Sequence, residues 1–223
     1  GRELNFIKTI KAYFLFIVST VILGLGICLV TFASLGTTAI TSPPYVMSQF
    51  IPITFGMFTM LMNTLYVALQ WILLGREFPN IQYLQLLVGP VLGVAIDYWS
   101  PFISSIPKTF YAVQVCMVIA GCIVIALSIV LQLKANVVNN PAEGIVKVIA
   151  MKMNKPFSSI KLLFDVVLVI IAVVISIISL GTIYGVREGT VISAILVGPL
   201  VKVIQFFINY ERHERKEIKG QTH

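Results

Sequence analysis

The feature that most constrains the fold is a long stretch, residues 12–75, that contains no Asp, Glu, Lys, Arg or His. One membrane-spanning helix needs about 20 apolar residues, so this stretch has room for more than one. The chain is 58% hydrophobic and only 11% charged, whereas soluble domains carry about 25% charged residues. A soluble core of 223 residues could not bury so much apolar surface. We therefore expect a multi-pass protein that contacts the lipid bilayer.

A second feature is the tetrapeptide Leu-Val-Gly-Pro, which occurs at residues 87–90 and again at 196–199. The same order of segments precedes each copy: a long apolar segment, a short segment containing proline, and a second long segment. The sequence therefore predicts an all-α polytopic membrane protein built from two internal repeats that form a single membrane domain. The predicted parts are the first repeat at 1–104, the second repeat at 105–210, and a charged cytoplasmic tail at 211–223.

The topology depends on whether the two short segments cross the membrane. If they do not cross, each repeat has three long transmembrane helices plus one short re-entrant or broken helix, the halves are inverted, and 13 of the 16 Lys and Arg residues are cytoplasmic. If they do cross, each repeat has four crossing helices, the halves are parallel, and 11 are cytoplasmic. The distribution of positive charge favours the first arrangement. Both arrangements place the two termini in the cytoplasm.

Local signals predict where several segments begin and how they pack. The first span is expected at Ala12–Ala33. Asn140 and Pro141 should start the second short helix, and Glu143 would complete a capping box there. Three glycines are expected to let helices approach closely: Gly24, Gly26 and Gly121.

Three ionisable residues fall within or near the predicted spans, namely Asp97, Asp165 and Lys202. A charge at the centre of a bilayer costs about 3 kcal/mol or more, so a functional role is a natural interpretation. The structural alternative is a side chain at the end of a span that faces headgroup water. Asp97 stands beside Tyr98 and Trp99 as in an aromatic belt, and Lys202 could snorkel.

Two further candidates follow from aligning the repeats by hand. At an offset of 102 residues, Asn63 of the first copy matches Asp165 of the second. An amide in one copy and an acid in the other predicts a single charge at the centre, with Lys161 as its partner at i−4 or Lys202 from the other element. Glu143 is either a helix-start residue or a substrate ligand at a half-helix.

Several function classes are excluded or disfavoured. The basic residues that give the chain its +7 charge lie at the ends and in short connectors, which indicates membrane orientation and not nucleic-acid binding. The three cysteines have no metal spacing, and we expect neither a metal nor a cofactor. No HExxH, GxSxG or P-loop motif is present, so an enzyme is not expected.

Four phrases spread over nearly the whole chain occur together: Leu35-Gly36-Thr37-Thr38-Ala39; Thr54-Phe55-Gly56 with Leu61-Met62-Asn63; Pro141-Ala142-Glu143-Gly144 with Phe164-Asp165; and Arg187-Glu188-Gly189-Thr190. In these phrases the chain resembles the YczE/YitT-type family of bacterial integral membrane proteins. It lacks the soluble C-terminal domain of the YitT branch and is more similar to the YczE-like branch. The resemblance implies a location in the bacterial plasma membrane and a fold, but no activity.

The sequence thus predicts a small secondary transporter or permease of the bacterial plasma membrane, with a site for a small molecule or ion at the interface of the repeats. The site candidates are Asp165, Asn63, Glu143, Lys202 and Asp97. The alternative is a membrane scaffold or accessory factor for another enzyme, without transport activity. The substrate, the coupling ion and the oligomeric state, a homo-oligomer included, are left open.

Overall fold

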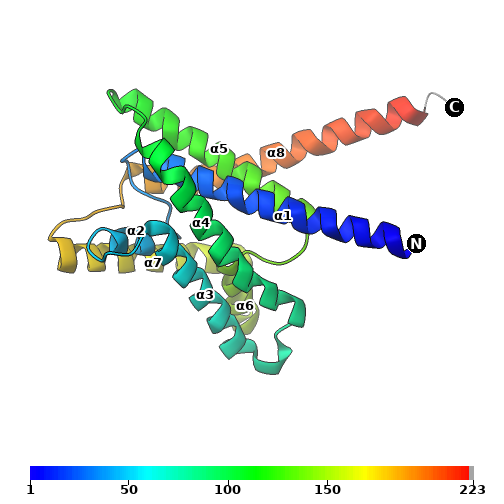
Figure 1. The fold of residues 1–223 in the computed structure, drawn as a ribbon, viewed down its shortest axis with the longest axis horizontal. Coiled ribbons are helices and arrows are strands. Elements are labelled where there is room, and N and C mark those ends of the chain that lie inside the picture. The colour runs from blue at the N-terminus through cyan, green and yellow to red at the C-terminus, as the bar shows by residue number, and fades with distance from the viewer. Residues whose placement is uncertain (221–223) are drawn as a thin grey trace.

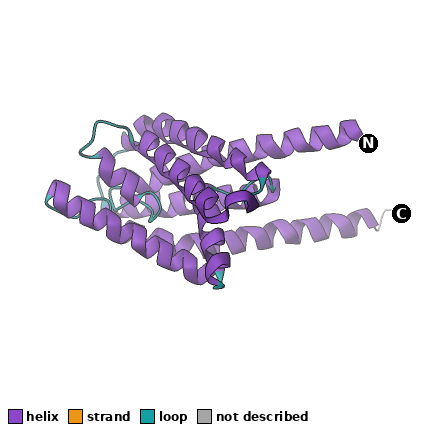
Figure 2. Cartoon of the chain, turned by 90° about the horizontal axis from the view of Figure 1, so that it is seen from below, coloured by secondary structure: helices purple, strands orange, loops and turns teal. Residues whose placement is uncertain are grey.

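The computed structural model describes residues 1–220 of the 223-residue chain, and the regular structure in this part is entirely helical (Figures 1 and 2). Six long helices are present: α1 (Arg2–Thr31), α3 (Phe55–Leu74), α4 (Gln85–Ser104), α5 (Tyr111–Ala135), α7 (Phe157–Leu180) and α8 (Glu188–Gly220). The shorter elements are α2 (Ser42–Ser48), α6 (Pro141–Met153), and two 3-10 turns between α3 and α4, η1 (Gly75–Glu77) and η2 (Asn80–Leu84).

The two short helices settle how many helices can cross a bilayer. The six long helices are long and apolar enough to do so. Helix α2 has 7 residues and α6 has 13, so at 1.5 Å per residue they measure about 10 and 20 Å, less than the ~30 Å of a hydrocarbon core. The structure therefore agrees with the six-span arrangement and not with eight crossing helices. With six spans, both termini lie on the same side, as Figure 1 shows.

The helix ends differ from the sequence expectation at both ends of the chain. Helix α1 begins at Arg2, ten residues before the predicted Ala12, and α8 continues through the charged tail as far as Gly220. Charged residues end an apolar run but do not end a helix, because Lys, Arg and Glu are themselves good helix formers. The tail is thus one helix with the last span as far as Gly220; residues 221–223 lie outside the described part.

The core is built where α1 meets α4 and α5, and glycines allow the close approach. A Cβ at Gly24 would lie 2.9 Å from that of Ala95 on α4. A Cβ at Gly26 would lie 2.7 Å from a side-chain carbon of Ile125 on α5. A Cβ at Gly121, on the same helix α5, would lie 2.9 Å from the carbonyl oxygen of Gly26. The packing predicted for Gly24, Gly26 and Gly121 is confirmed. Around these contacts lie buried side chains such as Cys28, Val30, Ile96 and Val118.

The other helix contacts come in matching sets. Helix α1 packs on α4 and α5 packs on α8; α2 packs on α3 and α6 packs on α7; α2 also packs on α7, and α6 on α3. Each short helix therefore contacts a long helix of its own half and one of the other half. The matching sets agree with the predicted duplication, but the duplication and the boundaries at 104 and 210 stay predictions.

Two loops far apart in sequence tie the halves together at the end opposite the termini. The amide of Thr37 donates to the carbonyl of Gly185 at 2.9 Å, and the amide of Gly189 donates to Leu35 at 2.7 Å. Arg187 also donates to the carbonyl of Ser34 at 3.1 Å. Since backbone groups away from water need partners, these bonds fix where α8 begins relative to the end of α1.

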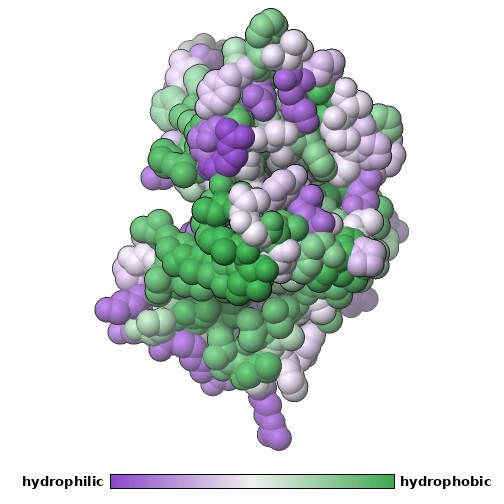
Figure 3. Space-filling view, turned by 90° about the vertical axis from the view of Figure 1, so that its left-hand side faces the viewer, coloured by the Kyte–Doolittle hydropathy of each residue, from purple (hydrophilic) through white to green (hydrophobic). Residues whose placement is uncertain are grey.

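The outer surface is largely apolar, as a lipid-facing surface must be. Figure 3 shows a broad area of apolar side chains on one face of the molecule. Helices α7 and α8 contribute strongly, because only 17% and 6% of their most apolar windows are buried. Together with the six candidate spans, this surface identifies a multi-pass membrane protein.

Candidate functional site

The candidate site centres on an ion pair on α7. The ammonium of Lys161 lies 2.8 Å from both carboxylate oxygens of Asp165. The two residues stand one turn apart, and their side chains keep 31% and 20% of their accessible surface. Of the two predicted partners, Lys161 and Lys202, the first is the observed one. The pair lies in the first half of a helix that is long and apolar enough to cross a membrane.

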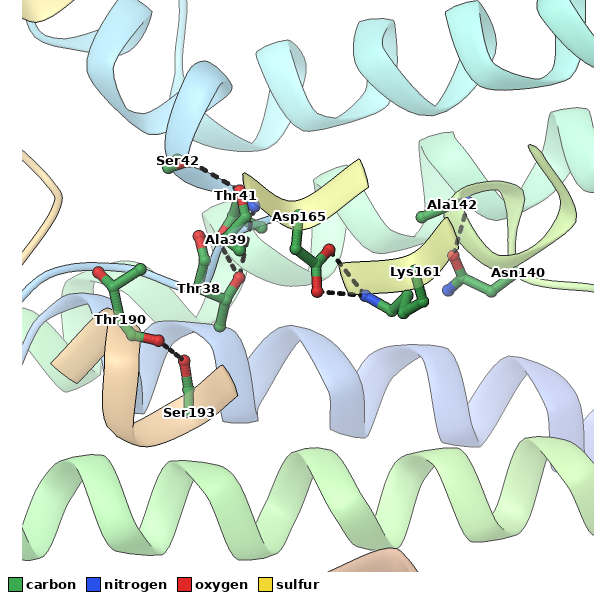
Figure 4. Close-up of polar contacts among 10 residues, drawn as sticks. All are labelled: Thr38, Ala39, Thr41, Ser42, Asn140, Ala142, Lys161, Asp165, Thr190 and Ser193. Atoms are coloured by element: carbon green, nitrogen blue, oxygen red, sulfur yellow. Dashed lines mark hydrogen bonds and ion pairs between the residues drawn. The ribbon is translucent and has the colours of Figure 1, made fainter. Parts of the chain in front are cut away.

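A cluster of hydroxyl groups from the first half lies directly before α2, the short helix that packs on α7. Thr37 accepts or donates bonds of 2.8 Å to Thr31 and 2.7 Å to Thr41, and Thr41 is also bonded to Thr38. Helix α2, which begins directly after Thr41, packs on α7. In the view of Figure 4, Asp165 is drawn between Lys161 and the pair Thr38 and Thr41. The charged pair thus lies on the helix against which the short helix following these hydroxyls packs.

Helix α3 contributes two buried polar groups that have no partner. The side-chain nitrogen of Asn63 and the hydroxyl of Tyr66 are both buried and make no hydrogen bond in the described part of the chain. Tyr66 packs edge-on against Phe164, with ring centroids 5.5 Å apart, and Phe164 directly precedes Asp165 on α7. An unsatisfied buried polar group costs about 1–3 kcal/mol, so a partner that bonded to either group would recover that cost.

Asn63 itself faces α4 and not the ion pair. Its residue is 4% exposed, and a Cβ at Gly89 would meet the Cβ of Asn63 at 3.4 Å. Asn63 and Asp165 are therefore at matching positions in the aligned sequence, but only Asp165 carries a charged partner. At the same offset of 102, the position of Lys161 is taken in the first half by Thr59, which donates to its own helix backbone at 2.9 Å.

Asp97 has a structural position at the other end of α3. Its carboxylate accepts a bond of 2.7 Å from the hydroxyl of Thr54 and one of 3.0 Å from the amide of Gly56. Thr54 is the N-cap of α3. A carboxylate at a helix N-terminus is stabilised by the free amides and by the helix dipole. These contacts account for Asp97 as a clamp between α4 and the start of α3.

Glu143 lies in the first turn of α6, where the predicted helix start is confirmed. Asn140 is the N-cap, Pro141 is the first residue, and the Asn140 side chain accepts a bond of 3.2 Å from the amide of Ala142. Glu143 does not bond back to Asn140 among the described residues, so the predicted capping box is only half formed. Its side chain lines a cavity, and Lys147 lines the same cavity.

Lys202 is exposed on α8 and makes no ion pair or hydrogen bond within residues 1–220. Helices α7 and α8 make at most a marginal contact. Lys161, and not Lys202, therefore pairs with Asp165. The site does not bring Lys202 or Asp97 next to the ion pair.

Sequence reasoning did not single out Tyr66, Thr38 and Thr41 as site residues. A tyrosine in an apolar span and threonines before a proline pair have ordinary structural roles, and nothing in the pattern shows that they converge. It also left out a reciprocal amide pair: Gln70 and Gln85 exchange bonds of 2.9 and 3.1 Å between α3 and α4. A weak signal for that pair was present, because both glutamines stand in otherwise apolar segments.

Comparison with known proteins adds a family but no activity. A family model described as a family of unknown function, DUF6198, matches residues 10–206. No curated protein and no solved structure gives a significant match. No three His, Cys, Asp or Glu side chains come together in the described residues to form a metal centre.

Proposed function

We propose that this chain, which belongs to the DUF6198 family of unknown function, is a small secondary transporter of the bacterial plasma membrane. Its site would be the polar region between α2, α3 and α7. The observation that carries the proposal is the Lys161–Asp165 pair in the first half of α7, because ionisable groups within an apolar spanning segment are rare and commonly mark transport paths.

The surroundings of the pair support this interpretation. The polar groups on α7 and on the elements that pack against it are one charged pair, a partnerless tyrosine hydroxyl and threonine hydroxyls from the other half. Such groups could bind a cation or a proton at Asp165, while the neutral ones hold the rest of a small solute. The matching position in the other half carries the uncharged Asn63, so only one of the two halves would supply a carboxylate to the site.

The proposed mechanism uses the ion pair as a switch. While Lys161 holds the carboxylate, the site is neutral and closed to a further cation. A substrate cation or a proton that reaches Asp165 releases the Lys161 ammonium, and the changed charge balance favours a different arrangement of the helices around it. The crossed contacts of α2 with α7 and of α6 with α3 would carry this change between the halves.

The proposal includes the orientation, with both termini in the cytoplasm. In this orientation the α4–α5 connection at Ser104 faces outward. A single cysteine at Ser104 should react with an impermeant maleimide added to intact cells. A cysteine at Arg76, between α3 and α4, should react only after the cells are opened. The reverse pattern would overturn the orientation but leave the fold unchanged.

Transport is tested with the purified protein in vesicles on a solid-supported membrane. A panel of small cations, amino acids and organic acids is applied with and without a proton gradient, and transient currents are recorded. We expect at least one solute to give currents, and Asp165→Asn to abolish them without loss of folded protein. Asp97→Asn is the matched acid-to-amide control and should keep them. Currents of wild-type size in Asp165→Asn would remove this residue from the mechanism.

A scaffold or accessory role is the second candidate, and the low burial of α8 favours it. Only 6% of its most apolar window is buried, which leaves a whole helix face for a partner helix. A photo-crosslinking residue at Ile195, which is exposed on α8, would capture such a partner in cells. A single crosslinked protein together with an absence of currents for the whole panel would favour the scaffold.

A further inference from the structure

A separate cavity lies at the start of α6, outside the region around Asp165. It has a volume of about 110 Å³ and is formed by the end of α5, the α5–α6 connection and the first turns of α6. At roughly 30 Å³ per water molecule, it has room for about four waters or one very small solute. Its lining is mostly polar: Gln82, Gln132, Asn136, Asn139, Asn140, Glu143 and Lys147 stand beside Ile129, Leu133, Val137 and Val138.

Two opposite charges line this cavity without pairing with each other. Glu143 and Lys147 stand at i and i+4 on one helix, an order that commonly gives an ion pair. In the described residues, ion pairs form elsewhere, at Asp165 and at Glu188. Lys147 donates instead to the side chain of Asn139 at 2.9 Å, and Glu143 has no hydrogen-bond partner among residues 1–220. The cavity therefore presents an available carboxylate and an ammonium held apart from it.

A third group points to a ligand. The side-chain nitrogen of Gln132 is buried and has no partner in the described part of the chain. As an unpaired donor it needs an acceptor such as a carboxylate oxygen. Gln132 lies on α5, across the cavity from α6. The amide and Lys147 can thus serve the same negative group.

The side-chain amide oxygens of Gln82, Asn139 and Asn140 already accept hydrogen bonds, which disfavours a metal cation in this cavity. The Gln82 oxygen already accepts bonds of 2.8 Å from Gln85 and 3.2 Å from the amide of Asn139. Those of Asn139 and Asn140 accept from Lys147 and from the Ala142 amide. A hard cation needs six or more oxygen ligands, and Lys147 would repel it. A simple anion would be repelled by Glu143.

We infer that this cavity binds a small zwitterion of the amino-acid type. Its carboxylate lies toward Lys147 and Gln132, and its ammonium lies toward Glu143. The volume of about 110 Å³ suits an amino acid whose side chain is hydrogen or a methyl group. This site is distinct from the Asp165 region and does not rest on the proposed transport function, although a solute held here would stand on the side of the membrane where the termini lie.

The test is a binding assay on the purified full-length protein in detergent, with radiolabelled alanine as the probe. Labelled alanine should bind saturably, and unlabelled glycine should displace it, whereas leucine, acetate and methylammonium at the same concentration should not. Absence of displaceable binding to monodisperse wild-type protein would overturn the inference. Equal competition by acetate or by methylammonium would also overturn it, because a site for one charge would then suffice.

Variants then assign the charges. Glu143→Gln and Lys147→Gln should each weaken alanine binding at least tenfold, and Lys152→Gln, exposed on the same helix, should leave it unchanged. Glu143→Gln should bind acetate, because the substitution removes the repulsion between the Glu143 carboxylate and an anion and keeps the donors Lys147 and Gln132. If Glu143→Gln binds alanine like the wild type, the inference fails. Lost currents in Asp165→Asn would not affect this assay, so the two proposals fail separately.

Discussion

The helix pairs α3–α4 and α7–α8 occupy matching places in the two predicted repeats but pack differently. Helices α3 and α4 make one of the most extensive contacts in the molecule, whereas α7 and α8 make at most a marginal one. In the first pair, Gly56 and Gly93 face each other backbone to backbone. At the repeat offsets, the second pair carries Ser158 and Lys202 there, both exposed.

The difference shows that matching positions in the two predicted repeats do not make matching contacts. The hydrophobic effect does not drive helices together inside a membrane. Packing there depends on how closely the backbones can approach, and small residues decide that distance. A lysine in the place of Gly93 cannot enter such a contact and must reach toward water or headgroups. The first half is therefore a tight pair clamped by Asp97, and the second half is open toward the lipid.

The largest effect is expected when a side chain is added to the tight pair. A Cβ at Gly93 would lie 2.5 Å from the carbonyl oxygen of Gly56, which is backbone and cannot rotate away. Gly93→Ala should lower the free energy of unfolding by about 1–3 kcal/mol, measured as a drop in melting temperature in detergent. Gly198→Ala on α8 is the control, since nothing lies within 4 Å of its Cβ. Equal losses in both variants would show that helix packing is not the cause.

A smaller effect is expected when the clamp between α3 and α4 is removed. Asp97→Ala takes away the acceptor of the Gly56 amide and of the Thr54 hydroxyl, which should cost about 1–2 kcal/mol. At the offset of 109, the matching residue is Phe206, which is exposed on α8. Phe206→Ala should change the melting temperature little. An unchanged melting temperature in Asp97→Ala would mean that the cap adds no stability to the α3–α4 contact.

The smallest effect on stability is expected at the ion pair. Asp165→Asn makes the second half resemble the first, where Asn63 stands. A partly exposed pair at i and i+4 contributes about 0.3–0.5 kcal/mol, so the melting temperature should change by about 2 °C or less for a protein of this size. A large drop would make the Lys161–Asp165 pair a structural element and would weaken the functional interpretation.

The sequence predicted the charged residues of the candidate site, but it did not predict which other side chains lie beside them. Asp165 and its partner Lys161 follow from a charge in an apolar segment and a spacing of four residues. Glu143 follows from a helix-start pattern. The roles of Asp97 and Lys202 do not follow, because whether a charge near a span caps a neighbouring helix or faces the surroundings depends on what packs beside it. Tyr66 and the threonines join the site only through contacts between helices distant in sequence.

The sequence by itself determined the solvent, because apolar length is a local property of the chain. It left six and eight spanning helices open, and the lengths of α2 and α6 decided for six. It also fixed where α6 begins, since caps and prolines act within one turn. Only the tertiary structure decided which helices touch, which charges pair, and where a cavity is left beside α6. Those outcomes depend on the fit of surfaces brought together from distant parts of the chain, and one glycine or one lysine at a contact changes that fit.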